Sequence, residues 1–236
     1  MKYIGWLKTM LLAAAIIIAG YFIGNMHRLG KKYDRYVQVK GLSEREVDAD
    51  LAVWPMSITL TGNNLVTLQQ DIESQNKKVS SFFIEHGFNE EELTQGTINV
   101  TDARANIYNN NAQSSEYRYL ANSEFTVRTA DIPKLRKALK ESTELISDGV
   151  LLGSKNTWQP IEYIFTGLNE LKPEMIEEAT KNAREVAEKF ARDSNAQVGE
   201  IRIARQGLFS ISDRDQNTPQ IKLVRVVSTI DFQLED

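Results

Sequence analysis

The chain has 236 residues, of which 42% are hydrophobic, so it is long enough for one large domain or two small ones. Its formal net charge of −4 argues against nucleic-acid binding, which requires a basic surface. It contains no cysteine, which excludes disulfide bonds and thiolate chemistry.

Residues 1–29 predict one N-terminal transmembrane helix that serves as a signal anchor. The uncharged run from Thr9 to Gly24 would be about 24 Å long as a helix, shorter than a hydrocarbon core of about 30 Å. A start at Tyr3, with the Lys8 ammonium group reaching back to the headgroups, lengthens it to a full span. The alternative is a cleaved signal peptide, but no A-x-A pattern follows the apolar run, so a retained anchor is favoured.

A basic linker, residues 30–35, follows the apolar segment and bears on its orientation. The simplest interpretation is a solvated spacer, and attraction to anionic lipid headgroups is the second. The cations on the C-terminal side of the apolar segment outnumber Lys2 and Lys8 on its N-terminal side. These C-terminal cations are Arg28, Lys31, Lys32 and Arg35. The positive-inside rule alone would therefore place the rest of the chain in the cytoplasm.

Residues 36–42 and 47–61 are predicted strands. In the second, apolar and polar residues alternate, and Pro55 cannot donate to a ladder, which places this strand at a sheet edge or makes it bulge. Asn63 or Asn64 can cap the helix that follows, and Gly87 is a suitable residue at which to end it. Its predicted buried face is Leu65, Leu68, Ile72, Val79 and Phe82.

Residues 96–108 and 116–129 are predicted to pair as a hairpin, with the polar segment 109–115 as its flexible connection. Asp131 and Pro133 begin a further helix, which carries Leu135, Leu139 and Ile146 and ends at Gly149. Short strands are expected at residues 150–152 and 161–166.

Residues 172–206 give the clearest structural signal, a helix that runs into a strand. Pro173 suits the first turn of a helix, and apolar residues then recur at three- and four-residue steps. This spacing predicts a buried face made of Ile176, Ala179, Ala183, Val186 and Phe190. Small alanine side chains on or beside this face, including Ala187, would let the helix lie close to a sheet. The helix should end near residues 193–195, and Gly199 should open the strand.

The last strand, residues 224–234, alternates between two faces, one of which carries Arg225, Thr229 and Asp231. The predicted buried face is Val224, Val226, Ser228, Ile230, Phe232 and Leu234. Strands outnumber helices and favour hairpins. This order predicts an α+β fold in which antiparallel sheets pack against helices.

No residue pattern indicates catalysis. His27 and His86 lack sequence partners for a triad or a zinc site, and phosphate-binding loops and a nucleophile elbow are absent from the sequence. Residues 213–215, Asp-Arg-Asp, lack the glycine and the distal glutamate of a calcium loop, so they are interpreted as a charged loop. Residues 90–92, three glutamates, are interpreted as a charged helix start or turn. We therefore predict no catalytic, cofactor-binding or metal residue, and no enzyme activity.

Four aromatic residues could line a ligand surface, and they are Tyr108, Tyr117, Tyr119 and Phe209. Alternating aromatic residues on a hairpin more often belong to a core or a subunit contact.

Two motifs resemble hallmarks of the SIMPL domain family, which is named from a signalling molecule that associates with a mouse pelle-like kinase. The first is the alanine-rich helix with its turn and strand, represented by Ala179, Ala183, Ala187, Ala191, Asn195, Ala196, Gly199, Ile201 and Ala204. The second is the opening strand and turn, residues 37–41 followed by residues 48–50. The similarity covers residues 36–234, and it is architectural, without a catalytic signature.

The resemblance implies export, because the family includes bacterial periplasmic and immunogenic outer-envelope proteins. We follow it against the charge count and expect a SIMPL-like domain, residues 36–236, in the periplasm, anchored in the inner membrane. Channel-like family members imply a homo-oligomer, such as a ring or cage, with a structural or stress-protective role in the envelope. The alternative is a ligand-binding module or an enzyme with a pocket that the sequence does not show.

Self-association is also expected from the strands themselves. Long strands with few charges are a pairing hazard when they lie at a sheet edge. The candidates for such edges are the strand over residues 116–129, the strand that contains Pro55, and the last strand.

Overall fold

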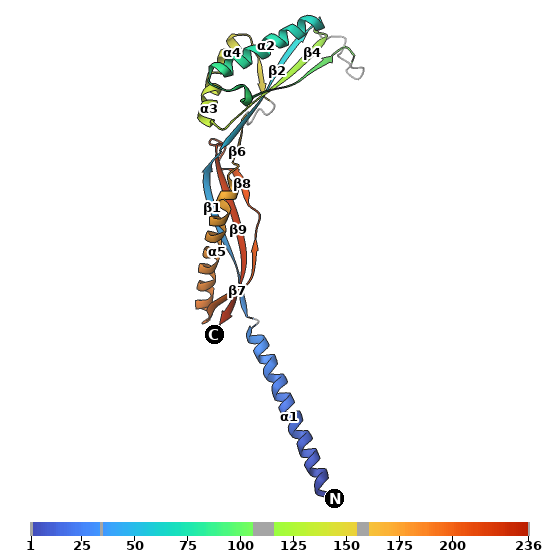
Figure 1. Cartoon of the computed structure of the whole chain (residues 1–236), viewed down its shortest axis with the longest axis vertical. Helices are drawn as coiled ribbons and strands as arrows, with labels where there is room; N and C mark the ends of the chain where they lie inside the picture. Colours follow the sequence, from blue (N-terminus) through green and yellow to red (C-terminus); the bar gives the residue numbers. More distant parts are fainter. Residues whose placement is uncertain (1, 34, 106–115, 155–160, 236) are drawn as a thin grey trace. The chain divides into compact units, whose positions relative to one another are not determined.

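The computed structural model describes residues 2–33, 35–105, 116–154 and 161–235. The chain divides into two compact units, and each is built from segments that are far apart in the sequence (Figure 1). The first unit comprises residues 1–45, 169–212 and 223–236, and the second comprises residues 46–168 and 213–222. The segments 109–115 and 155–160, which include Trp158, and Tyr108 lie outside the described residues.

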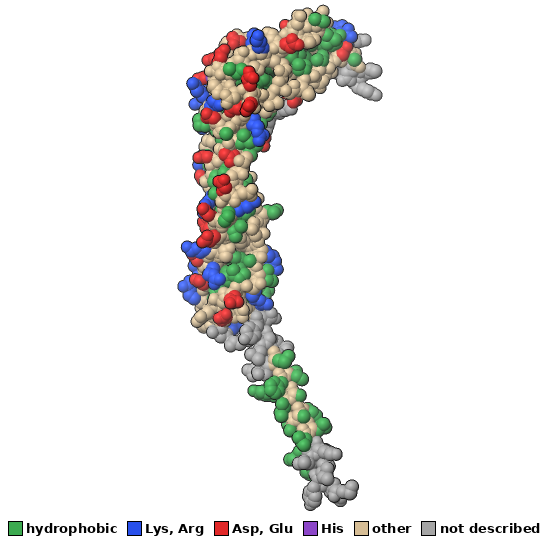
Figure 2. All heavy atoms as spheres, in the orientation of Figure 1, with side chains coloured by type: hydrophobic (Ala, Val, Ile, Leu, Met, Phe, Trp, Pro, Cys, Tyr) green, Lys and Arg blue, Asp and Glu red, His purple; other side chains and the backbone are tan. Residues whose placement is uncertain are grey.

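The chain begins with helix α1, Lys2–Tyr33. Residues 10–24 of this helix are all exposed, and hydrophobic side chains follow one another along it (Figure 2). Within the described part of the chain, no helix meets the length and apolarity needed to cross a membrane. The predicted helix is confirmed, although it continues through residues 30–33 of the predicted linker, and the predicted membrane span is not confirmed.

The rest of the first unit is a sheet covered by one long helix. The sheet has the order β1-β9-β7, with β8 also paired to β9. These strands are β1 (Tyr36–Asp48), β7 (Gln197–Gln206), β8 (Ser210–Asp213) and β9 (Ile221–Glu235), and the helix is α5 (Leu168–Asp193). Strands β7 and β9 are antiparallel, with register shifts on either side of Ile201.

Helix α5 packs through an alanine face, as predicted, and its buried residues are Met175, Ala179, Ala183, Ala187 and Ala191. The backbone of β1 approaches this face so closely that a Cβ atom at Gly41 would lie 1.7 Å from the Ala179 carbonyl oxygen. Next to this contact, two hydrogen bonds also join β1 to α5. The Asn182 amide donates to the Leu42 carbonyl at 2.8 Å, and the Ser43 hydroxyl donates to Glu178 at 2.9 Å.

Two details of the α5 prediction were wrong. The helix begins at Leu168, so Pro173 lies inside it and not at its start. Phe190 is 56% exposed, and Ile176 and Val186 are only half-buried, because the buried face follows the strict four-residue repeat of Met175 and the alanines. The predicted end is confirmed, since Asn195 adopts a positive φ of 52° beyond the last turn.

Strand β9 is the central strand of this sheet. Its predicted buried face is confirmed for Val224, Val226, Ser228, Ile230 and Phe232. Asp231, predicted to be exposed, is also buried, because Gln38 of β1 donates to its carboxylate at 2.8 Å and Arg205 of β7 lies 3.6 Å away.

The second unit contains a five-stranded sheet of order β3-β4-β2-β5, with β6 also paired to β2. The strands are β2 (Leu51–Gly62), β3 (Leu93–Asp102), β4 (Tyr119–Thr129), β5 (Leu152–Ser154) and β6 (Glu162–Ile164). The predicted pairing of the third and fourth strands is confirmed, with an irregular register between Gln95 and Ile98.

The edge prediction was wrong, because β2, β4 and β9 are all interior strands. Pro55 is tolerated in a central strand since it falls in a gap between two short neighbours. Strand β6 pairs with residues 51–53 of β2, and β5 pairs with residues 56–58. No ladder bond is lost at Pro55 on that side.

Helix α2 (Leu65–Glu85) crosses one face of this sheet (Figure 1). Asn64 caps it, as predicted, by accepting from the Val66 N–H at 2.9 Å, and Gly87 ends it with a φ of +84°. The core beneath it centres on the fully buried Phe83, whose ring contacts those of Trp54, Phe88 and Phe125. Leu65, predicted on the buried face, is 48% exposed.

The remaining elements of the second unit are the 3-10 turn η1 (Glu90–Glu92) and helices α3 (Ile132–Glu141) and α4 (Thr143–Ser147). One continuous helix was predicted here, but the helix is interrupted at Ser142. The hydroxyl of Ser142 donates to the Leu139 carbonyl at 2.8 Å. The break turns Leu145 into the core and leaves Ile146 60% exposed. Both units have antiparallel sheets packed against helices, which confirms the α+β prediction.

Candidate functional site

The two histidines do not form a site in the described structure. The His27 side chain lies outside the described residues. The Nδ1 atom of His86 lies 2.7 Å from the Phe82 carbonyl oxygen, and its Nε2 atom lies 2.9 Å from Glu141. Both ring nitrogens therefore have a partner, one within α2 and the other on α3. Among the described residues, no group of three or more His, Asp or Glu side chains could hold a metal ion.

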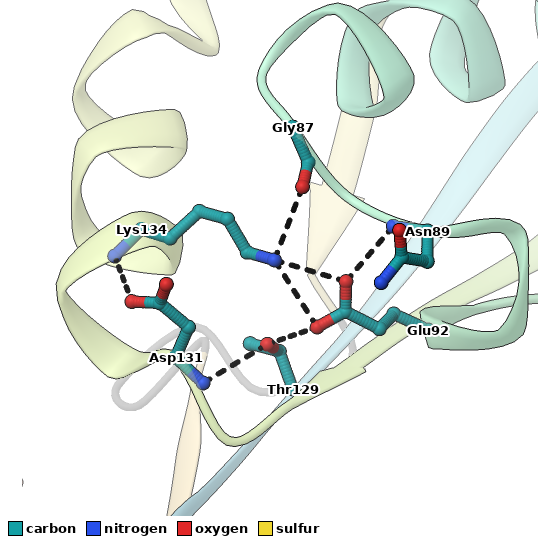
Figure 3. Close-up of polar contacts among 6 residues, drawn as sticks. All are labelled: Gly87, Asn89, Glu92, Thr129, Asp131 and Lys134. Carbon is teal, nitrogen blue, oxygen red and sulfur yellow. Dashed lines mark hydrogen bonds and ion pairs between the residues drawn. The ribbon is translucent and has the colours of Figure 1, made fainter.

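A connected polar cluster centres on Glu92 (Figure 3). Its carboxylate accepts from the Thr129 hydroxyl, from the Asn89 N–H at 2.9 Å, and from the Lys134 ammonium at 2.9 Å. Lys134 also donates to the Gly87 carbonyl at 3.2 Å, and Asp131 caps α3 by accepting from the Lys134 N–H. The cluster joins η1, β4 and α3.

This cluster is built for stability. Burial by itself raises the pKa of Glu92, but the donors from Thr129, Asn89 and Lys134 outweigh it and lower the pKa below its usual value. The carboxylate is thus kept ionised with its acceptor positions filled. A general acid or base needs a proton that it can exchange with a substrate, and Glu92 presents the opposite condition.

The Asp-Arg-Asp segment is also internally satisfied. Asp215 accepts from the Thr218 hydroxyl, from Arg214 at 3.1 Å, and from the Asn217 and Thr218 N–H groups. These bonds lower the pKa of Asp215 to about 2. Lys222 contacts Asp213, and Arg214 reaches Glu46 at 3.1 Å. The predicted charged loop is confirmed for Arg214 and Asp215, whereas Asp213 is the last residue of β8.

Of the four aromatic residues that could line a ligand surface, Tyr117, Tyr119 and Phe209 lie among the described residues. Tyr119 packs against the small cluster of Leu68, Ile72 and Ala121 under α2, whereas Tyr117 lies before β4 and is 42% exposed. Phe209 belongs to the first unit, between β7 and β8.

A surface that the sequence did not indicate lies along β3, at the margin of the second unit. Helix α2 covers β2 and β4, and β3 is the outer strand of the described sheet. A groove of about 410 Å³ runs between α2 and β3, lined by Leu65, Leu68, Gln69, Ile72, Glu73, Ile98 and Val100. Ile98 and Val100 are each 44% exposed, although they lie opposite the buried Ser123 and Ala121 of β4.

We call this surface the β3 edge: the outer side of β3 together with the groove to α2. The apolar residues on β3 were visible in the sequence, but their position at an edge depends on the strand order.

The comparisons with known proteins agree with the architecture. The family model of SIMPL, described as a protein of unknown function (DUF541), matches residues 37–228. The chain belongs to the SIMPL family. No curated protein matches this SIMPL chain. The alanine face of α5 and Gly41, which carried the resemblance, are the parts that meet in the first unit.

Proposed function

We propose that this SIMPL-domain protein is a non-enzymatic structural protein of the cell envelope, which self-assembles into a homo-oligomer through the β3 edge. The observation that carries the proposal is a long outer strand without a basic residue, bordered by an apolar groove. Unpaired backbone groups along such a strand are a template for another strand.

The other described edges are less suited to pairing. Strands β1 and β7 carry arginine or lysine along their length, such as Lys40, Arg45, Arg202 and Arg205, which discourages edge-to-edge contact. On the far side of the second sheet, β5 and β6 have three residues each. Strand β3 has ten residues, and its one charged side chain, Asp102, is held by Arg118 at 3.0 Å.

A second copy of β3 is the simplest occupant of this edge. Antiparallel pairing of the two strands would place Ile98 and Val100 of each copy over the groove of the sheet that they extend, removing exposed apolar surface from water. Such a contact is two-fold and produces a dimer. The ring or cage that the family resemblance implies requires a second interface in addition.

The proposal places the protein at the inner membrane, with residues 36–236 in the periplasm. Support comes from the exposed apolar side chains of α1 and from the family resemblance. Lipid would cover the surface that the described protein leaves open on α1. A protective role during envelope stress is likewise proposed from the resemblance.

The assembly test uses the full chain in a neutral detergent at tens of micromolar, with mass measured by light scattering. Ile98→Lys introduces a charge at the β3 edge and is expected to shift the protein to smaller species. The matched control is Ile203→Lys on β7, because Ile203 is exposed to the same 44% but its strand already carries arginine. A wild-type monomer, or equal effects of the two substitutions, would refute assembly through β3.

The membrane test follows the mature chain in cells. Retention of Met1 by mass analysis and resistance of the membrane-bound fraction to carbonate extraction are expected. External protease should digest the folded domain in spheroplasts. A mature chain that begins near residue 25, or a domain protected from protease, would contradict this part of the proposal.

A further inference from the structure

The second unit contains a larger cavity at the foot of α3, away from the β3 edge. Its volume is about 660 Å³, within the range that holds a small organic ligand. Three segments line it: the end of β1, the start and exposed face of α3, and the chain that enters β9. The lining residues used below are Ala49, Ile132, Arg136, Lys137, Lys140 and Ile221.

The cations of this cavity come from one face of a single helix. Arg136 and Lys140 are four residues apart, so they lie one above the other, and Lys137 is adjacent. Repulsion between like charges at this spacing destabilises a helix. The described residues offer these cations little compensation: Glu141, one turn beyond Lys137, bonds to His86 instead. Asp48 is the one acidic residue in the lining.

The base of the cavity is apolar and firmly held. Ala49 and Ile132 are buried beneath it. The Ala49 N–H donates to the Gln220 carbonyl at 2.8 Å, and the Arg214 N–H donates to the Ile221 carbonyl at 2.9 Å. The turn between Arg214 and Ile221 is closed by the hydrogen bonds that the Asn217 and Thr218 N–H groups donate to Asp215. The wall that faces α3 is therefore preorganised, which lowers the entropy cost of binding.

We propose that this cavity binds a small organic anion, a phosphate or carboxylate group attached to an apolar body. The guanidinium of Arg136 and the ammonium groups of Lys137 and Lys140 take the anionic group, and Ala49, Ile132 and Ile221 contact the apolar part. Charge-assisted hydrogen bonds from several cations to one anion are the stronger class of hydrogen bond. Binding would also relieve the repulsion among the three cations.

The test is calorimetric titration of the full chain, in a neutral detergent, with hexyl phosphate as the probe. Inorganic phosphate and hexanol separate the contributions of the anionic group and the apolar body. The cavity variant is the double substitution Arg136→Gln, Lys140→Gln. The matched control is Lys77→Gln, Arg128→Gln, which removes the same charge from two exposed positions of the same unit outside the cavity. Thermal melts confirm that both variants fold.

Saturable binding of one hexyl phosphate per chain is expected, with weaker binding of either half of the probe. The cavity variant should bind about tenfold or more weakly, since two charge-assisted contacts are lost, and the control should bind as the wild type does. Absence of saturable binding, or equal weakening in both variants, would overturn the proposal.

A last arm separates two sources of the same chemistry. The chain is reconstituted in vesicles of neutral phospholipid, with or without anionic phospholipid, and the hexyl phosphate titration is repeated. Competition by the anionic lipid assigns the site to a lipid headgroup. Unchanged affinity assigns it to a soluble anion.

Discussion

Replacing Gly41 by alanine should destabilise the first unit more than any other small substitution in β1. An added Cβ atom would lie 1.7 Å from the Ala179 carbonyl oxygen and 2.7 Å from the Ala183 nitrogen. Ordinary contact begins at 3.4 Å, so the shortfall against the Ala179 oxygen is 3.4 − 1.7 = 1.7 Å. Both obstructing atoms belong to the backbone of α5, so a side-chain rotation does not relieve the clash.

The helix would have to move away from the sheet along the whole alanine face. The alanine side chains are too short to stay in contact with the sheet after a displacement of this size, so their dispersion contacts are lost. We expect Gly41→Ala to lower the free energy of unfolding by about 3 kcal/mol or more. Urea unfolding followed by far-ultraviolet circular dichroism measures the loss, and hydrogen exchange of the α5 amides locates it.

The control is Gly199→Ala in β7 of the same unit. There the nearest obstruction is the Glu235 carboxylate oxygen at 2.6 Å, at the end of a flexible side chain that can rotate away. The expected loss is below about 1 kcal/mol. If the two alanines cost the same, the close approach of β1 to α5 does not limit the stability of the protein, and the reasoning above is wrong.

Other substitutions test the alanine face, the Glu92 cluster and the α2 cap. Ala183→Glu buries an unpaired charge and should cost about 3 kcal/mol or more, whereas Glu185→Ala, at an exposed position, should cost less than about 1 kcal/mol; equal melting temperatures would refute the assigned faces. Because the pKa of Glu92 is lowered on folding, the stability it contributes is present above its usual value of 4.5 and is lost as the pH falls below it. Thr129→Val removes one donor and should make that acid-induced loss of stability smaller in urea titrations; an unchanged pH dependence would contradict this. Asn64→Ala should lower the free energy of unfolding by about 1 kcal/mol, and no change in the urea midpoint would show that the cap is unimportant.

Helix α5 shows what hydrophobic periodicity can and cannot predict about a buried face. A period of 3.6 residues allows two neighbouring interpretations, one with Val186 and Phe190 inside and one with Ala187 and Ala191 inside. Hydrophobicity favours the first, because phenylalanine gains more from burial than alanine does. The structure selects the second, because Gly41 brings a backbone close to the helix and only small side chains fit between them. That constraint lies on a distant strand, outside any local pattern.

Strand order was not predictable from alternation. A strand with one buried and one polar face reads the same way in the centre of a sheet and at its edge. Length favours β2, β4 and β9 as edge strands, but all three are interior. The expectation that Pro55 places its strand at a sheet edge was wrong for a related reason. Two short strands, β5 and β6, divide the pairing that one long neighbour would have completed.

The basic face of α3 is visible in the sequence as a spacing of cations. Arg136, Lys137 and Lys140 follow one another at helical spacing, and the acidic residue that should pair with Lys137 is Glu141. Only the fold shows that His86 engages Glu141 and that an apolar hollow lies beneath the three cations.

Attachment to a membrane would change what the β3 edge can achieve. Pairing of one ten-residue strand with its copy buries little surface, and the groove adds only a few apolar side chains, so association in dilute solution should be weak. Confinement by α1 in two dimensions raises the effective concentration of the subunits without adding any contact. On the proposed function, a chain that lacks residues 1–29 should therefore dissociate at higher concentration than the full chain in vesicles. Ile98→Lys should reduce association in both settings. If removal of the N-terminal segment leaves the association constant unchanged, confinement contributes nothing and the β3 edge must account for assembly alone.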